Sequence, residues 1–514
     1  MSFTSGTFIV FVLTALVVYY LVPQRFRWVV LLLASYGFYF TGGAGAMGYL
    51  LFITLTTYLA GRVLGALNEK RKGLPATDKA GLERVKRRKK QVVLVTLLGN
   101  FGLLYAVKYL GVTFDLLGLP RPGLVLVLPL GLSFYMFQSV GYVIDCYRGK
   151  FPPEKNLAKF ALFVSFFPQV VQGPISRFGD LAPQLTKGNE FDADQVKYGT
   201  QLAMWGYFKK LVISDRAGVV AATVFGGFTQ YRGTVLFAGV LFYCIQLYCD
   251  FSGGIDITRG VAQMFGIDVA ENFCRPLFAV SLTDYWRRWH ITLGQWMRDY
   301  VFYPMSLSRP LTQLGKWTRR HIKGKLGKIV PTSIATFTVY FLIGIWHGAE
   351  LRYILFGFWN GILITASLLL EGKFQYWRKR LHIRTESLLW RLFQMIRTSA
   401  LVFLGRYLTR ADSVRTALWM IKMTVLDPEI AALWDGRMLA LGLNGWELMI
   451  VFLGMAVLLT AECYQEFGGH VRKALEQRHW LVQWAAIFIP LAVIFVLGVM
   501  GGDYIAPGFI YQQY

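Results

Sequence analysis

Two histidines are the residues of this 514-residue sequence best suited to carry chemistry. His347 ends an otherwise uncharged apolar run in the string TVYFLIGIWHGAE, and His290 ends the string WRRWH (residues 286–290). Ionisable side chains in or beside apolar segments are energetically costly, and they are functional candidates by default. A neutral imidazole exchanges a proton near pH 7, as a general base must. The alternative is that each histidine only hydrogen-bonds neighbouring helices.

The residues before His290 indicate a site for an anion. Guanidinium groups bind phosphates through paired hydrogen bonds and stack on indole rings. Arg287 and Arg288, which stand between Trp286 and Trp289, are therefore candidates to hold the phosphates of a substrate. The alternative is a cluster of arginines that snorkels to the membrane interface beside tryptophans, or that binds lipid headgroups.

A carboxylate and a hydroxyl follow another apolar run, in the string YCDFSGG (residues 248–254). We expect Asp250, with Ser252 beside it, to orient a histidine or to pair with an arginine of WRRWH; the alternative is a solvated helix end. The sequence contains no P-loop, GxSxG or HExxH string. Its five cysteines include no CxxC pair, so neither a metal site nor a disulfide framework is expected.

The composition places these residues in a membrane protein. Hydrophobic residues make up 55% of the chain and charged residues only 16%, whereas a soluble domain carries roughly 25% charged residues. The net charge of +25 is concentrated in four short basic stretches, 69–90, 309–328, 373–384 and 472–478, as in cytoplasmic loops of membrane proteins. No basic and aromatic stripe marks a nucleic-acid surface. We therefore expect membrane lipids, and no nucleic acid, as partners.

Thirteen apolar segments are candidates to cross the membrane. With every basic stretch on one side, an even number of crossings is needed between 146–155 and 308–328, yet three segments lie there. We expect 156–172 to be re-entrant, which leaves about twelve crossings with both termini outside, and the charged stretch 274–310 to form amphipathic or re-entrant helices at the cytoplasmic face. The thirteen segments are 6–22, 27–41, 46–66, 91–110, 124–145, 156–172, 196–214, 232–249, 329–347, 352–370, 393–408, 444–465 and 480–500.

Five strings, taken as an ordered set, resemble the membrane-bound O-acyltransferase family. The resemblance is strongest to its bacterial branch that O-acetylates alginate, and it implies an all-α polytopic fold. It also implies a ring of about 11–13 transmembrane helices, with re-entrant or amphipathic helices, around a central pore. The implied organisation is N-terminal transmembrane helices (1–123), a catalytic core (124–370), C-terminal transmembrane helices (371–500) and an extracytoplasmic aromatic tail (501–514). The strings are PLGLSFY (129–135), QGPISRF (172–178), DFSG (250–253), WRRWH (286–290) and GIWHG (344–348).

The resemblance also assigns roles to residues. His347 corresponds to the family's catalytic histidine, and His290 to its second active-site histidine. Trp346, Asp250, Ser252 and the tryptophans and arginines of WRRWH become candidates for binding the donor or the acceptor. Because the segment before His347 is long enough to traverse most of a membrane at about 1.5 Å per residue, we expect the two histidines to lie toward opposite ends of one pore.

The implied reaction moves an acetyl group from acetyl-CoA on the cytoplasmic side across the bacterial cytoplasmic (inner) membrane. The group would O-acetylate an extracytoplasmic polysaccharide such as alginate, with an exported acetyltransferase as partner. Acetyl-CoA would be a substrate, and no bound cofactor is expected. The alternatives are D-alanyl transfer or peptidoglycan O-acylation by the same fold, and, from other classes, a proton-coupled transporter or flippase, or a non-enzymatic scaffold.

The sequence ends in an aromatic string, PGFIYQQY (residues 507–514). Such a tail is typical of an anchor at the membrane interface. It also resembles the Phe-x-Tyr terminal motif of surface-polymer acylation systems, with Tyr514 where phenylalanine is more usual. The hypothesis is that Tyr511 receives the acetyl group, with His347 as the base, and passes it to a partner.

Overall fold

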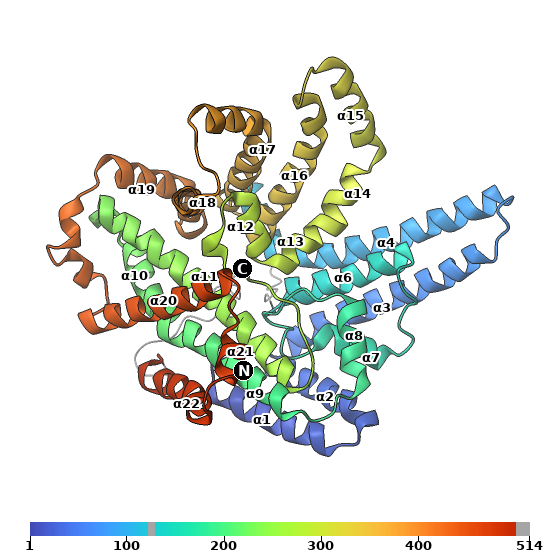
Figure 1. The fold of residues 1–514 in the computed structure, drawn as a ribbon. Coiled ribbons are helices and arrows are strands. Elements are labelled where there is room, and N and C mark those ends of the chain that lie inside the picture. The colour runs from blue at the N-terminus through green and yellow to red at the C-terminus, as the bar shows by residue number, and fades with distance from the viewer. Residues whose placement is uncertain (122–128, 500–514) are drawn as a thin grey trace. The chain divides into compact units, whose positions relative to one another are not determined.

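The computed structural model describes residues 1–121 and 129–499. Within these residues the backbone is mostly helical, and the only strand-like pairing there is a single antiparallel bridge between Phe273 and Trp289. The predicted all-α class is confirmed, and each of the thirteen predicted segments contains a helix (Figure 1).

The described chain forms two compact units made of interleaved segments. Of the described residues, the first unit contains 1–121, 129–203 and 254–270, and the second contains 204–253 and 271–499. Two helices, α9 (Ala193–Tyr207) and α11 (Gly233–Met264), run from one unit into the other. Every predicted site residue in the described chain belongs to the second unit.

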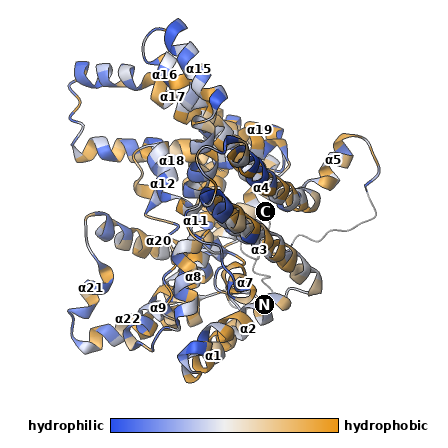
Figure 2. Ribbon diagram, turned by 90° about the vertical axis from the view of Figure 1, so that its right-hand side faces the viewer, coloured by the Kyte–Doolittle hydropathy of each residue, from blue (hydrophilic) through white to orange (hydrophobic). Residues whose placement is uncertain are grey.

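The first unit contains a long antiparallel pair of helices, α3 and α4, both of which change in polarity along their length. Figure 2 shows each helix turning from hydrophobic to hydrophilic toward the basic stretch that joins them. Leu94, Val95 and Leu98 of α4 are exposed apolar side chains, as is expected for a surface that faces lipid. The helices of this unit are α1 (Gly6–Leu21), α2 (Arg27–Phe40), α3 (Ala44–Lys72), α4 (Lys79–Lys108), α5 (Leu110–Leu116), α6 (Leu132–Arg148), α7 (Leu157–Ser165) and α8 (Phe178–Lys187).

The segment expected to be re-entrant forms a helix of nine residues, α7, followed by irregular backbone. Nine residues rise about 14 Å in an α-helix, about half the thickness of the hydrocarbon core. Residues 166–172 are buried, and the backbone N–H of Phe167 donates to Ser35 Oγ over 3.0 Å. Irregular backbone at membrane depth requires such burial and such partners. The length and the burial both support the re-entrant interpretation.

The second unit combines short helices with long ones. The charged stretch 274–310 forms a 3-10 turn (Pro276–Phe278) and helices of four to seven residues, too short to cross a membrane, as expected. The short elements there are α12 (Leu282–Arg288), α13 (Ile291–Met297), a π-helical turn (Arg298–Phe302) and α14 (Tyr303–Ser306). The other helices are a π-helical turn (Phe208–Ser214), α10 (Asp215–Gly226), α15 (Arg309–His321), α16 (Leu326–His347), α17 (Leu351–Arg380), α18 (Leu388–Arg410), α19 (Val414–Leu426), α20 (Gly445–Glu466), α21 (Val471–Glu476) and α22 (Trp480–Leu497).

Eight helices in the described chain are long and apolar enough to span a membrane: α3, α4, α11, α16, α17, α18, α20 and α22. The helix α1 is apolar but shorter, with 16 residues. The protein is therefore a multi-pass membrane protein. The predicted total of about twelve crossings stays a prediction.

Candidate active site

The hairpin of α16 and α17 positions His347, the last residue of α16. Glycines allow the two helices to approach closely: a Cβ on Gly344 would lie 2.6 Å from the carbonyl oxygen of Tyr353, and one on Gly357 would collide with the carbonyl oxygen of Tyr340. The close approach leaves the His347 side chain 8% exposed. The apolar run and its glycines thus hold this imidazole at a buried helix end.

Trp346 lies close to both candidate histidines. Its ring centroid is 4.8 Å from that of His347 and 5.8 Å from that of His290, and all three side chains are buried. The expectation that the histidines lie toward opposite ends of one pore is therefore wrong, because both imidazoles lie close to the same indole ring. That prediction considered only the length of the segment before His347. His290 comes from the connection between α12 and α13, which packs against the C-terminal end of α16.

His290 occupies an unusual backbone conformation between α12 and α13. Its φ is +48°, in the left-handed region, and its side chain is 2% exposed. The Phe251 ring meets the imidazole edge-on, with centroids 4.9 Å apart. His290 lies outside the helices long enough to span a membrane, and burial lowers its pKa to about 3, because an apolar environment disfavours the charged imidazolium. The imidazole is therefore neutral at physiological pH.

The two arginines before His290 have different surroundings. Arg287 is exposed and makes no hydrogen bond or ion pair with any residue that the structure describes. Arg288 is engaged by two carboxylates, with Nε 3.2 Å from Asp284 Oδ1 and Nη1 2.9 Å from Glu466 Oε2. Arg287 is thus available to an anionic ligand, whereas Arg288 holds the segment in place.

Glu466, the last residue of α20, joins three arginines from separate segments. Its carboxylate lies 2.8 Å from Arg275 Nε, 2.9 Å from Arg288 Nη1 and 2.7 Å from Arg391 Nη2. The glutamate side chain is 7% exposed, and a carboxylate buried to this degree is stable only when it is paired. This cluster ties α12 and the loop before it to α18 and α20.

The tryptophans of WRRWH pack into the surrounding helices. Trp286 Nε1 donates to Asn360 Oδ1 of α17 over 3.1 Å. Trp289 stacks on Tyr285 with centroids 5.6 Å apart, and Arg406 of α18 lies over its ring at 5.1 Å. Both indoles therefore fix the position of α12 against the membrane-spanning helices.

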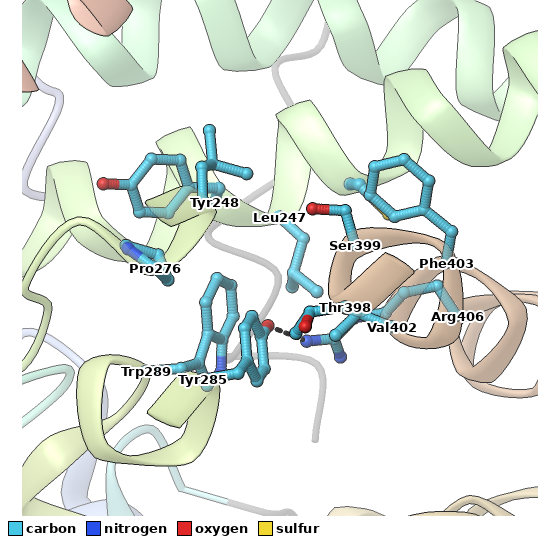
Figure 3. Close-up of a pocket in the computed structure, with 12 residues that line it drawn as sticks. Leu247, Tyr248, Pro276, Tyr285, Trp289, Thr398, Ser399, Val402, Phe403 and Arg406 are labelled. Atoms are coloured by element: carbon cyan, nitrogen blue, oxygen red, sulfur yellow. Dashed lines mark hydrogen bonds between the residues drawn. The ribbon is translucent and has the colours of Figure 1, made fainter. Parts of the chain in front are cut away.

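A small cavity of about 30 Å³ opens beside this stack (Figure 3). In the figure Tyr285 and Trp289 form one wall, and Arg406 Nη2 donates to the Tyr285 hydroxyl over 2.9 Å. The cavity is large enough to hold water. The remaining lining residues are Cys244, Leu247, Tyr248, Pro276, Leu277, Thr398, Ser399, Val402 and Phe403.

Asp250 and Ser252 belong to a buried network with two lysines that the sequence interpretation missed. Lys210 Nζ lies 2.6 Å from Asp250 Oδ1 and 2.8 Å from Asp215 Oδ1, and Lys209 Nζ donates to Ser252 Oγ over 3.0 Å. Asp250 therefore has Lys210 as an ion-pair partner. The expectation that Asp250 orients a histidine or pairs with an arginine stays a prediction. The π-helical turn that contains both lysines faces this part of α11 and places two cations beside Asp250 and Ser252.

Sequence reasoning missed five residues of this region. Lys209, Lys210 and Arg406 interrupt predicted apolar spans, and that signal could have found them. Glu466 follows directly after the predicted span 444–465, and Asn272, which contacts His290, stands in a polar connection. Nothing in their spacing indicated a partner.

Two further expectations concern metals and the C-terminal tail. Within the described ranges, no three His, Cys, Asp or Glu side chains converge on a common point where a metal ion could bind. Tyr511, the predicted acyl carrier, lies outside the described residues.

Comparison with known proteins places this site in a family. Residues 153–315 match the model of the membrane-bound O-acyltransferase family. The chain is 32% identical over 421 residues to a probable alginate O-acetylase of Pseudomonas syringae pv. tomato, which covers 81% of this chain and 74% of that protein. It is 30% identical to the peptidoglycan O-acetyltransferase of Helicobacter pylori, over 47% of each chain. It is 28% identical to the teichoic acid D-alanyltransferase of Bacillus subtilis, over 49% of this chain and 60% of that protein.

The family match covers His290 together with α11, α12 and α13, and the longer match to the Pseudomonas protein covers 81% of the chain. These similarities favour an enzyme over a transporter, a flippase or a scaffold. The chain belongs to the membrane-bound O-acyltransferase family and is an O-acyltransferase.

Proposed function

We propose that this protein transfers an acetyl group from acetyl-CoA, bound on the cytoplasmic side of the bacterial inner membrane, toward hydroxyl groups of an extracytoplasmic polysaccharide such as alginate. Relatives named as probable alginate O-acetylases match 70–81% of the chain, which supports this substrate class. The observation that carries the proposal is the pair of buried histidines on one indole ring, with Arg287 exposed three residues before His290.

The proposed reaction requires a base and correct positioning more than activation, because a thioester is already reactive. His347 takes the proton of the acceptor hydroxyl while the hydroxyl oxygen forms a bond to the thioester carbonyl carbon. The bond from that carbon to sulfur then breaks, and the CoA thiolate leaves and takes up a proton. Arg287 binds a phosphate of the donor.

The route to the polysaccharide includes two further proposals. An exported acetyltransferase partner completes the transfer, and Tyr511 carries the acetyl group between the two proteins. Both rest on the sequence resemblance. A Tyr511→Phe protein is expected to bind acetyl-CoA normally and to lose polymer acetylation in cells; full acetylation with this variant would contradict the carrier role.

The reaction is tested with purified protein in lipid nanodiscs and radiolabelled acetyl-CoA. His347→Ala should insert normally and lower acyl transfer by at least about 100-fold, because loss of a general base costs about 10²–10⁴-fold. The control is His321→Ala, since His321 is exposed at the end of α15 and its ring stacks on Trp317 of the same helix. Retained transfer by His347→Ala would overturn the proposed role of this residue.

The nature of the acyl group needs a parallel measurement, because relatives named as D-alanyltransferases match about half of the chain. Acetyl-CoA and a D-alanyl thioester on a carrier protein are supplied separately to the same preparation. Transfer from acetyl-CoA supports the proposal. If only the D-alanyl donor supports transfer, the acyl group is D-alanyl and the acetyl assignment is refuted.

A further inference from the structure

We infer that Asn272 is a positioning residue that fixes the tautomer of His290, so that Nε2 of this imidazole carries the lone pair. The inference rests on the proposed function in one respect: His290 must take part in acyl transfer. It concerns a residue that no part of the resemblance singles out.

The contacts of Asn272 determine which atom of its amide faces the histidine. One side-chain atom, Oδ1, lies 3.0 Å from Thr292 N, 2.9 Å from Thr292 Oγ1 and 3.2 Å from His290 Nδ1. A backbone N–H is always a donor, so the atom that it meets must be the amide oxygen. An oxygen acceptor requires a proton on His290 Nδ1, and a neutral imidazole then has its lone pair on Nε2.

The surrounding backbone prevents the amide from turning away. Asn272 is fully buried, and its carbonyl oxygen accepts the N–H of Ile291 over 3.0 Å. The next residue forms the bridge from Phe273 to Trp289, and Cys274 N donates to Arg288 O over 2.9 Å. The segment that carries Asn272 is therefore paired, residue by residue, with the segment that carries His290.

The same pairing holds His290 in its left-handed conformation, at φ +48°. Such a conformation is strained for a non-glycine residue and persists only where the surroundings determine it. Asn272 fixes the chain directly after the histidine, because its backbone and side chain accept hydrogen bonds from Ile291 and Thr292. Asn272 thus helps to hold the backbone and the ring of His290, and its amide oxygen determines the tautomer.

The chemical consequence is a division of roles between the histidines. With the proton on Nδ1 donated to Asn272, His290 Nε2 accepts a hydrogen bond from a hydroxyl or thiol and cannot donate one. Burial lowers the pKa of His290 to about 3, which keeps the ring in this neutral state at ordinary pH. His290 therefore orients a hydroxyl or thiol group of a substrate by accepting its hydrogen bond. His347 is the residue that takes the proton of the acceptor hydroxyl.

The test compares three variants in the nanodisc assay, with kcat, KM for acetyl-CoA and the pH profile measured between pH 5 and 9. Asn272→Ala removes the acceptor, so both tautomers become populated, and kcat should fall by at least about 10-fold with KM changed by less than about 3-fold. Asn272→Asp keeps an acceptor for all three donors and should recover most of kcat. Its carboxylate favours the imidazolium, so activity should fall at the acid end of the range, where the wild type stays level.

Thr292→Val is the matched control, since it removes one hydrogen bond to the same oxygen without touching the imidazole. It should change kcat by less than about 3-fold and leave the pH profile unaltered. Equal losses in Thr292→Val and Asn272→Ala, or an Asn272→Asp protein as inactive as Asn272→Ala, would overturn the inference. A wild type that releases no CoA would instead refute the proposed function, so the two failures are distinguishable.

Discussion

At the scale of single residues, the two neighbouring arginines of WRRWH have separate tasks. Arg287 is exposed, whereas Arg288 is held by Asp284 and Glu466. A guanidinium that is already paired with two carboxylates is a poor partner for a further anion, because the phosphate would be repelled by the same carboxylates. The donor-binding role predicted for both residues therefore suits Arg287 better.

We predict opposite outcomes for alanine substitution of the two residues. Arg287→Ala should raise KM for acetyl-CoA by about 10-fold, the loss of one charge-assisted contact, with the free energy of unfolding changed by less than about 0.5 kcal/mol. Arg288→Ala should lower the free energy of unfolding by about 1–3 kcal/mol, since Glu466 keeps Arg275 and Arg391 as partners. Donor titrations and thermal unfolding in detergent measure both, and an unchanged KM in Arg287→Ala would refute its assignment.

At the scale of elements, the hairpin of α16 and α17 decides where His347 lies. The two helices touch through glycines, and the carbonyl oxygen of Tyr340 occupies the space where a side chain on Gly357 would stand. Any larger residue must separate the helices, and it moves the imidazole together with the end of α16. The catalytic geometry therefore depends on residues that carry no functional group.

We predict that Gly357→Ala lowers both stability and activity. Overpacking costs about 1–3 kcal/mol, and a displacement of about 1 Å at a catalytic group can cost 100-fold in rate. Gly99→Ala in α4 is the control, because a Cβ there has nothing within 4 Å. Thermal unfolding and acyl transfer are measured for both variants. A Gly357→Ala protein as active as Gly99→Ala would show that the close packing of the hairpin is dispensable for catalysis.

At the scale of the whole molecule, the charge distribution predicts the orientation in the membrane. Cysteines introduced at Lys86 and Arg319, in two of the basic stretches, should react with a membrane-impermeant maleimide only after the membrane is opened. A cysteine at Thr41, between α2 and α3, should react in intact cells. The background protein has its five native cysteines, all free thiols, replaced. Labelling of Lys86 and Arg319 from opposite sides would contradict the common placement of the basic stretches.

Part of the site could be predicted from the sequence because its signals are local. The apolar segments gave the helices, and the ordered strings gave His290, His347 and Trp346 as one set. The partners of these residues could not be predicted, because they come from distant segments. Asp250 meets Lys210, 40 positions away, and Arg288 meets Glu466, 178 positions away. The hydrophobic periodicity of a sequence does not indicate which distant charged residues form an ion pair.

The sequence by itself determined the membrane-spanning character, the helical class and the family of this protein. Hydropathy and short strings are local features, and they can be recognised without knowing how the helices pack. Only the tertiary structure decided that both histidines share one indole ring, that Asn272 sets the state of His290, and that one arginine is available while its neighbour is not. The physical reason is that burial, tautomer and ion pairing depend on which side chains meet in space, and distance along the chain does not specify those meetings.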